Sequence, residues 1–286
     1  MANFNSGKYI KDAIESIINQ TYHNWELIIV DDCSTDNSID IINSYLHDAR
    51  IKLIRLDRNH GVGFTKKTAC ENASNDILGI LDADDKLEKN ALEILAIEYR
   101  NEPEYGFIYT NLWSCDSELK NCKLNTMDRS IPDKTSLFNP TITHFKTFRR
   151  KDYEKTPGYD PNLKAAVDKD IIYKMEEISK FKYLPEPLYY YRQHENGISQ
   201  GKNKLSVRVY HYIAKLNAYN RRLNTNIPNL SRKALFFEFL KLTLNKQIKA
   251  LRYLDNLIRI PKIIEYFDSI FYRLPTRLKK LIEKIS

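Results

Sequence analysis

The chain has 286 residues, of which 42% are hydrophobic and 29% are charged, and its formal net charge is +8. This length allows one full hydrophobic core with room for an additional helical region. The composition is that of a soluble globular protein and argues against a disordered or fibrous one. No apolar run reaches the roughly 18–20 residues that span a bilayer, and no signal peptide opens the sequence.

The positive charge is concentrated in the last third of the chain. Residues 201–286 contain 19 Lys and Arg against five Asp and Glu, so the preceding part is acidic. A basic segment on an acidic body suits an anionic membrane surface or a nucleic acid as a partner. Sequence motifs of known nucleic-acid-binding modules are absent, so we expect no nucleic-acid partner.

The four cysteines lie far from any metal-ligand or redox spacing. They form no CxxC pair and stand at Cys33, Cys70, Cys115 and Cys122. Scattered cysteines without an export signal predict free thiols, because disulfides are rare in the cytosol. We therefore expect a cytoplasmic protein.

The first 112 residues alternate between helix and strand patterns. Apolar residues at helical spacing predict helices near residues 8–20, 39–46, 64–73 and 92–99. Short runs rich in β-branched residues predict strands at 25–32, 51–56, 76–81 and 106–112. Strands separated by helices of this length indicate βαβ units, and hence an α/β fold with a mainly parallel sheet.

The rest of the chain is less regular. Residues 115–140 are polar and predict a long loop, and residues 141–194 mix short strands with one helix near 168–179. After about residue 206 the pattern is helical, basic and aromatic. We therefore expect an α/β domain over residues 1–200 and a basic amphipathic helical region over residues 201–286.

Two acidic stretches follow predicted strands. Asp31 and Asp32 end one of them, and Asp82 and Asp84 end another. Ligands of open α/β sheets bind at these carboxyl ends. Because carboxylates at i and i+2 of an extended segment point to one side, Asp82 and Asp84 are candidate ligands for Mg²⁺ or Mn²⁺. The alternative for both stretches is turn formation and helix capping.

The motifs carry a resemblance to a known family. The stretch NFNSGKYIKDAIESIINQTYHNWELIIVDDCSTDNS, followed by LDADD, resembles family 2 glycosyltransferases, which have the Rossmann-like GT-A fold. The resemblance covers roughly the first 200 residues. It implies that Asp32 reads the pyrimidine base of a nucleotide-sugar, with Asp31 beside it. It also implies that Asp82 and Asp84 form a DxD motif, which holds the ribose and a divalent metal on the diphosphate.

Two more segments resemble parts of the family that face the sugar donor. In RNHGVGFTKKTA, Lys66 takes the place of a basic residue near the phosphates, where Arg is more usual. A lysine supplies the charge without the bidentate fork, and its alternative role is that of an exposed helix cation. The segment LPEPLYYYRQHENGIS resembles the closing YRxH motif, which implies that His194 approaches the diphosphate or the metal with support from Arg192. A purely structural histidine is the alternative.

The segment GYDPNLKAAVDKDIIYKM resembles the one that supplies the catalytic base. The family has an acidic pair whose second member deprotonates the acceptor hydroxyl, and this chain has Val167 followed by Asp168. Asp168 is therefore the candidate base, with Asp170 as the fallback and helix capping as the alternative role. His144, in ITHFKTFRR, is a weaker candidate on the acceptor side. One base without a second nucleophile implies inversion of the anomeric configuration.

The N-terminal segment departs from the family pattern. Family members have a strand before the segment that aligns with residues 2–5, and in this chain Met1 stands where that strand ends. We therefore expect the first strand to be missing, with a gap and unpaired strand edges beside it. A start within a longer reading frame, or a truncated chain, would account for this pattern. Nucleotide binding is then expected to be weak.

The leading hypothesis is a metal-dependent, inverting sugar transferase that uses a UDP-sugar and a glycan or lipid-linked acceptor. The resemblance implies a role in bacterial surface polysaccharide assembly, and the basic tail predicts peripheral binding to the inner face of the cell membrane. A packed helical subdomain is the alternative for the tail. The rival function is a non-catalytic nucleotide-sugar-binding protein or a truncated, inactive homologue. A nicotinamide-dependent oxidoreductase is disfavoured because no predicted strand leads into GxGxxG.

Overall fold

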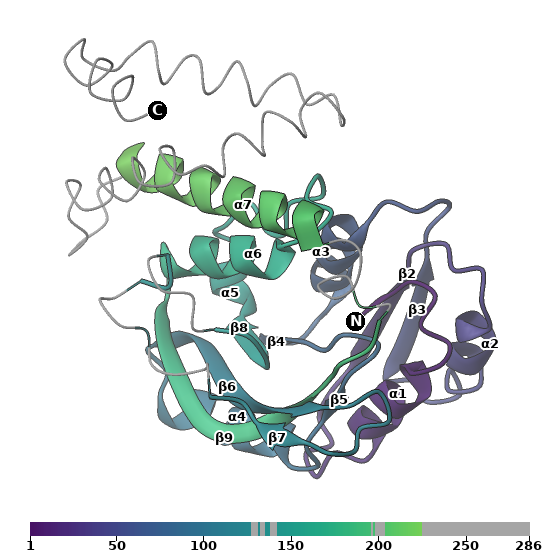
Figure 1. Cartoon of the computed structure of the whole chain (residues 1–286). Helices are drawn as coiled ribbons and strands as arrows, with labels where there is room; N and C mark the ends of the chain where they lie inside the picture. Colours follow the sequence, from purple (N-terminus) through teal and green to yellow (C-terminus); the bar gives the residue numbers. More distant parts are fainter. Residues whose placement is uncertain (127–130, 132–134, 138–141, 196, 198–203, 225–286) are drawn as a thin grey trace, which may run out of the picture. The chain divides into compact units, whose positions relative to one another are not determined.

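The computed structural model describes residues 1–126, 131, 135–137, 142–195, 197 and 204–224 (Figure 1). The chain divides into two compact units, Met1–Ala218 and Tyr219–Ser286. Only residues 219–224 of the second unit are among those described. The basic helical region predicted for residues 201–286 therefore lies mostly outside the described residues.

The N-terminal part of the chain alternates between strands and helices. In order, the elements are β1 (Ala2–Asn3), α1 (Ile10–Ile18), β2 (Leu27–Asp31), α2 (Ser38–Asn43), β3 (Ile51–Arg55), α3 (Val62–Asn72), β4 (Ile77–Ile80), β5 (Lys86–Leu87), α4 (Ala91–Asn101) and β6 (Tyr105–Cys115). Every helix and strand that the sequence predicts here is confirmed, with ends shifted by a few residues. The two-residue strands β1 and β5 were not predicted.

The hydrophobic pattern explains why these segments form as they do. Along α1 the buried apolar residues recur at helical spacing, whereas Lys11 and Asp12 on the other face are exposed. All five residues of β2 are buried, as expected for an interior strand of a parallel sheet. The main core gathers residues from these elements and from α4 and β6.

The second half of the domain contains three more strands and three more helices among the described residues. Its elements are β7 (Lys123–Leu124), β8 (Lys146–Arg149), α5 (Arg150–Tyr153), α6 (Val167–Glu176), β9 (Lys180–Arg192) and α7 (Lys204–Asn224). The predicted helix near residues 168–179 is thus α6. The predicted loop over residues 115–140 contains β7.

The strands form two sheets, not one mainly parallel sheet. The first has the order β1-β2-β3 and is entirely parallel. The second has the order β4-β8-β6-β9-β5, with β7 on β6, and in it only β6 and β9 pair in parallel. The first sheet is thus parallel, as the sequence predicts, and the second is mixed. The reason is that β8 returns to β6 without a described crossover helix, and such connections give antiparallel pairs.

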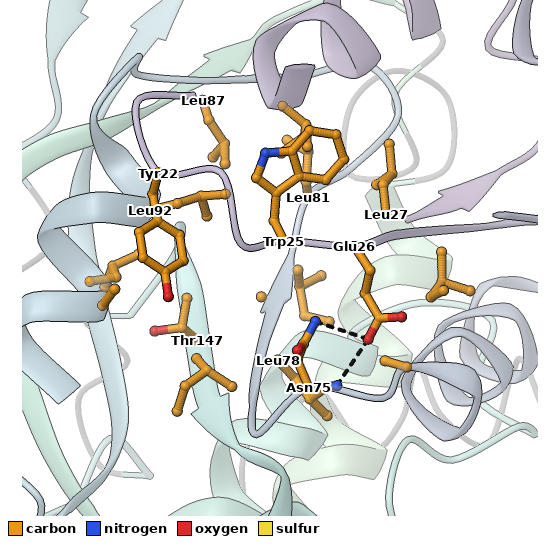
Figure 2. Close-up of a pocket in the computed structure, with 18 of the residues that line it drawn as sticks. Tyr22, Trp25, Glu26, Leu27, Asn75, Leu78, Leu81, Leu87, Leu92 and Thr147 are labelled. Carbon is orange, nitrogen blue, oxygen red and sulfur yellow. Dashed lines mark hydrogen bonds between the residues drawn. The ribbon is translucent and has the colours of Figure 1, made fainter. Parts of the chain in front are cut away.

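A cavity separates the two sheets. It measures about 380 Å³ and is lined by Ile28 of β2, residues 77–80 of β4, Met1 and side chains of α4 (Figure 2). Its lining is mainly apolar, and Figure 2 shows Trp25, Leu27 and Leu81 around it. The family resemblance placed an additional strand here, and only the two residues of β1 pair with β2. That a longer first strand is missing stays a prediction.

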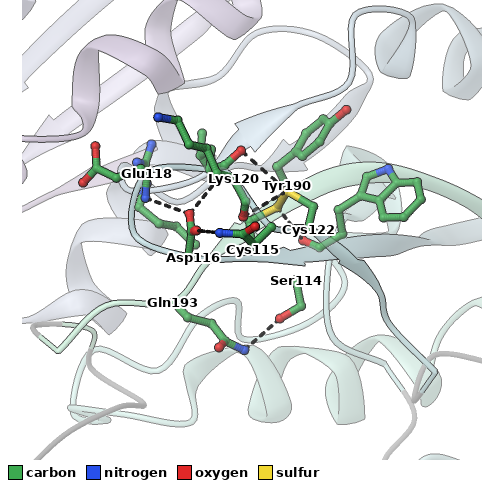
Figure 3. Close-up of a disulfide and its surroundings, with 12 residues drawn as sticks. Ser114, Cys115, Asp116, Glu118, Lys120, Cys122, Tyr190 and Gln193 are labelled. Carbon is green, nitrogen blue, oxygen red and sulfur yellow. Dashed lines mark hydrogen bonds between the residues drawn. A yellow bond between two sulfur atoms is a disulfide. The ribbon is translucent and has the colours of Figure 1, made fainter.

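Two of the cysteines form a disulfide, so the prediction of four free thiols is wrong. Cys115 bonds to Cys122, whereas Cys33 and Cys70 are free (Figure 3). The reason lies in the β6–β7 hairpin, where Trp113 pairs with Leu124 and Ser114 with Lys123. The same register places Cys115 opposite Cys122, with their Cα atoms 4.0 Å apart. The cysteines consequently no longer support the cytoplasmic assignment.

Reduction of this disulfide is expected to lower the free energy of unfolding by about 2 kcal/mol, because a short closed loop restricts the unfolded chain. Urea unfolding with and without dithiothreitol measures the difference. A Cys115→Ser, Cys122→Ser double variant is the control, and dithiothreitol should leave its stability unchanged. If all four cysteines of the denatured, unreduced protein react with iodoacetamide, the disulfide does not exist.

None of the described helices combines the length and the apolar character that crossing a lipid bilayer requires.

Candidate functional site

Asp31 and Asp32, at the end of β2, are both buried and hold backbone turns. Asp31 accepts hydrogen bonds from the Asn3 side chain, at 2.6 Å, and from the Ser34 amide, at 3.0 Å. Asp32 accepts from the amides of His60, at 2.7 Å, and Gly61, at 2.8 Å. These contacts fix the loops that follow β2 and precede α3, and neither carboxylate caps α2 or α3. Base reading by Asp32 stays a prediction.

Gly61 allows the backbone to form the turn that precedes α3. Its φ is 89°, a conformation that glycine adopts without steric cost. This conformation aims the Gly61 amide at the Asp32 carboxylate. The loop that starts α3 is thereby fixed to the end of β2, and α3 carries Lys66 towards the acidic residues.

Lys66 lies at the centre of an ion-pair network. Its Nζ atom is 2.9 Å from Asp82 Oδ1 and 3.0 Å from Asp168 Oδ1, and only 5% of its side chain is exposed. Burial alone would lower the pKa of Lys66, but the carboxylates of Asp168 and Asp82 outweigh burial and raise it. Lys66 is therefore not the exposed helix cation of the alternative reading.

Lys146, which the sequence did not single out, contacts the other oxygen of Asp168. Its Nζ is 3.4 Å from Asp168 Oδ2, 2.7 Å from the Thr143 carbonyl oxygen and 3.1 Å from His144 Nδ1. Burial would raise the pKa of Asp168, but Lys146 and Lys66 together hold it well below its usual range. The sequence offers little signal for this role, because Lys146 is one of two basic residues in the short strand KTFR and its burial is seen only in the structure.

The ligand atoms of Asp82, His144 and Asp168 all lie within 4.8 Å of one another. These residue types can hold a metal, but two ammonium groups already contact them. Adding a dication beside two lysines would introduce repulsion that the carboxylates no longer offset. The arrangement is better explained as a charge-balanced network than as a metal centre.

His144 stacks on Tyr189 and Tyr191, with ring centroids 4.8 Å and 5.4 Å apart. Burial and the charge of Lys146 lower the pKa of His144 to about 3. In the unfolded chain, His144 binds a proton as the pH falls through its ordinary pKa of 6.5. In the folded chain it stays neutral until the pH approaches 3. The free energy of unfolding should fall as the pH falls from about 6.5 towards 3.

His144→Gln is expected to remove this pH dependence, because glutamine retains a hydrogen-bond acceptor but does not titrate. The stability difference between variant and wild type should change by up to ~1.4 kcal/mol for each pH unit below about 6.5. Urea unfolding at pH 7.5, 6.5, 5.5 and 4.5 measures it. If the free energies of unfolding of the two proteins changed in parallel with pH, burial would not hold His144 in its neutral form.

Asp84 belongs to a second cluster, with His194. Oδ2 of Asp84 lies 2.8 Å from His194 Nε2, so Asp82 and Asp84 have different partners despite their i, i+2 spacing. The side chain of His194 is 8% exposed, and its ring lies 4.7 Å from that of Tyr9. Its Nδ1 atom is buried without a hydrogen-bond partner in the described part of the chain.

Arg192 positions this cluster by linking three segments. It donates hydrogen bonds to the carbonyl oxygens of Asp84, at 2.7 Å, and Ser117, at 2.6 Å, and forms an ion pair with Asp12 at 2.7 Å. Ser117 lies inside the disulfide loop. Arg192 therefore supports His194 by holding the surrounding segments together.

Asp85 and Asp170 serve as buried supports. Asp85 accepts hydrogen bonds from the Tyr189 hydroxyl and the Arg192 amide, both at 2.7 Å. Burial, followed by the charges of Asp84 and Asp82, raises the pKa of Asp85 well above its usual range. Asp170, the fallback base, forms a buried ion pair with Lys174 at 2.6 Å. The side chain of Asp170 is 2% exposed against 27% for Asp168, and this difference favours Asp168 as the candidate base.

Comparisons with known proteins point to one family. The family model described as "Glycosyl transferase family 2" matches residues 1–165. A chondroitin synthase from Escherichia coli is 30% identical over 226 residues, which cover 77% of this chain and 32% of that protein. The chain spans about a third of the length of the curated relatives that it matches first.

Two solved structures share the fold. TarS from S. aureus, residues 1–349 in complex with UDP-GlcNAc, superposes with a TM-score of 0.64 at 21% identity, over 84% of this chain and 70% of that one. A mannosyltransferase from Pyrobaculum calidifontis, in complex with GDP-Man and Mn²⁺, gives 0.59 at 15% identity, over 99% and 83%. At these identities the likeness establishes the fold alone.

Proposed function

The chain belongs to glycosyl transferase family 2 and has the GT-A fold, and on this premise we propose that it transfers a sugar from a nucleotide-diphosphate donor to a glycan or lipid-linked acceptor. One observation carries the proposal. Lys66 joins the carboxylate that follows β4, Asp82, to the candidate base at the start of α6, Asp168. A displacement at the anomeric carbon requires a base for the acceptor proton and positive charge near the departing diphosphate, and this arrangement offers both.

The donor is proposed to be a UDP-sugar. The resemblance of Asp32 to the pyrimidine-reading carboxylate supports uridine, and Asp32 is fixed at the sheet edge by His60 and Gly61. TarS, which shares the fold, is known in complex with UDP-GlcNAc. The mannosyltransferase was solved with GDP-Man, so guanosine is the alternative base.

A divalent cation fits beside Asp84 and His194. A carboxylate oxygen and an imidazole nitrogen face each other there at 2.8 Å, and Mn²⁺ accepts both ligand types. Mg²⁺ prefers oxygen ligands alone, so the imidazole favours Mn²⁺. The bound cation would neutralise charge on the departing diphosphate. The sequence also assigned Asp82 to the metal, but the contact of Asp82 with Lys66 favours Asp84 and His194 as the holders.

The protein side chains would carry the rest of the reaction. Asp168 takes the proton of the acceptor hydroxyl, and the acceptor oxygen forms its bond to the anomeric carbon as the bond to the diphosphate breaks. The electron pair leaves on the diphosphate, whose charge Lys66 helps to balance. One base without a second nucleophile gives a product of inverted anomeric configuration.

Donor turnover tests the proposal. Wild-type protein is incubated with Mn²⁺, a panel of UDP-sugars and short chondroitin and hyaluronan oligosaccharides, and release of UDP and of glycosylated product is measured. We expect acceptor-dependent UDP release with at least one donor, and inversion seen by NMR of the product anomer. Binding without turnover across the panel would favour the non-catalytic reading, and a retained anomer would contradict the single-base mechanism.

The proposed location is the cytoplasmic face of the cell membrane, where a lipid-linked acceptor and the basic segment would meet. Residues 201–286 carry the excess of positive charge, and helices rich in Lys, Arg and aromatic residues bind anionic lipid surfaces. The assembly of a surface polysaccharide is supported by the chondroitin synthase relative.

The full chain is expected to float with vesicles that contain 30% phosphatidylglycerol, and to stay in the soluble fraction with pure phosphatidylcholine. Because the attraction is electrostatic, 0.5 M NaCl should release the protein from the vesicles. Flotation in a density gradient measures both. Equal recovery with the two vesicle types would rule out an anionic membrane partner.

A further inference from the structure

Lys66 and Lys146 hold Asp168 in different ways. Among the described residues, Lys66 forms ion pairs with two carboxylates, those of Asp82 and Asp168, whose side chains are 26% and 27% exposed. The carboxylates of this ion pair are therefore accessible from solvent, and the Lys66 side chain, which is 5% exposed, lies next to them. Two of the three N–H groups of the Lys66 ammonium are used by the carboxylates.

Lys146 is held in place by neighbouring groups of its own segment. It is fully buried, donates to the Thr143 carbonyl oxygen at 2.7 Å, and contacts His144 Nδ1 at 3.1 Å. Asp168 is the one carboxylate within ion-pair distance of Lys146 in the described residues. Moving Lys146 away would leave a buried charge without a counterion, which is costly. Lys146 thus has a fixed position, and Lys66 is the exchangeable cation.

We propose that Lys66 is shared between Asp168 and the diphosphate of the donor, so that donor binding frees Oδ1 of Asp168 while Lys146 keeps Oδ2 in place. This inference rests on the proposed function, because it requires a diphosphate ligand. Lys146 is a positioning residue in this arrangement and touches no substrate. The base becomes available after the donor is bound, which favours binding of donor before acceptor and limits wasteful deprotonation of water.

The exchange predicts energetic coupling between Lys66 and Asp168 in nucleotide binding. Without a charge at residue 168, Lys66 no longer has to leave one of its partners when a diphosphate binds. UDP should then bind more tightly to Asp168→Asn. Uridine lacks the diphosphate and cannot recruit Lys66, so its affinity should be the same for both proteins.

A double-mutant cycle on the full chain tests the proposal. Affinities for UDP and uridine, with Mn²⁺ present, are measured by calorimetry for wild type, Asp168→Asn, Lys66→Met and the double variant. We expect Asp168→Asn to tighten UDP binding about tenfold, or ~1.4 kcal/mol, in the wild-type background. In the Lys66→Met background the same change should have an effect of less than about twofold.

Each other outcome counts against the proposal. If Asp168→Asn tightens UDP equally in both backgrounds, simple charge repulsion explains the effect and Lys66 is not shared. If it leaves UDP binding unchanged or weaker in the wild-type background, the exchange does not occur. Lys66→Gln, which can still donate to both carboxylates, replaces Lys66→Met if the latter does not fold. Failure of wild-type protein to bind UDP would contradict the proposed UDP-sugar donor, and the inference would fall with it.

Discussion

Asp84→Asn is expected to weaken binding of Mn²⁺ in the presence of UDP by at least about 100-fold, because it removes the anionic member of the proposed metal site. The amide oxygen of asparagine can still accept the hydrogen bond from His194 Nε2, which lies 2.8 Å from the carboxylate in the wild-type chain. The fold should therefore survive. Electron paramagnetic resonance of free Mn²⁺ measures the affinity directly.

Asp48→Asn is the matched control for charge. It removes one negative charge from a carboxylate that pairs with Arg50 rather than with any candidate site residue. Its Mn²⁺ affinity should equal that of wild type within about twofold, as expected for a charge outside the site. Equal affinities for wild type and Asp84→Asn would exclude Asp84 as a ligand. The Asp82, His144 and Asp168 group would then be the alternative metal site.

Asp168→Asn is expected to lower kcat by about 10²- to 10⁴-fold, because an amide cannot take the proton of the acceptor hydroxyl. UDP binding should persist or improve, which separates this effect from loss of the donor site. The assay is UDP release with the donor and acceptor identified in the turnover screen. The change retains the size of the side chain, and its amide oxygen can still accept a hydrogen bond from one of the two lysines.

Asp160→Asn controls for the loss of a carboxylate in the same segment. Its carboxylate caps the turn at Asn162 and contacts neither Lys66 nor Lys146. We expect wild-type kcat within about twofold, as for surface substitutions outside a site. A kcat for Asp168→Asn equal to that of Asp160→Asn would show that another group is the base.

The sequence predicted the fold best where local patterning decides it. Continuous apolar runs marked β2 and β4, and helical spacing marked α1 and α4, because these segments bury one consistent face. The carboxylates were placed correctly at strand ends. Their partners were not predictable, because partners depend on how α3, β8 and α6 pack against one another. Lys66, Lys146 and Asp168 are distant in sequence and meet only in the folded chain.

The errors have equally specific causes. The i, i+2 rule predicted a shared site for Asp82 and Asp84, but the two follow β4 in a turn, where strand alternation no longer applies. The disulfide was missed because the register of the β6–β7 hairpin cannot be read from the spacing of two cysteines alone. The antiparallel pairs of the second sheet were not predicted, because β8 pairs with β4 and β6 from the part of the chain where the βαβ pattern has ended.

The most direct test of the account is a calorimetric titration of UDP into the wild-type chain, with Mn²⁺ and again with EDTA. We predict binding with Mn²⁺ and at least about tenfold weaker binding with EDTA, because the cation would link the diphosphate to Asp84 and His194. Equal affinity in the two buffers would contradict the metal site. No binding in either buffer would contradict the uridine diphosphate donor that we propose.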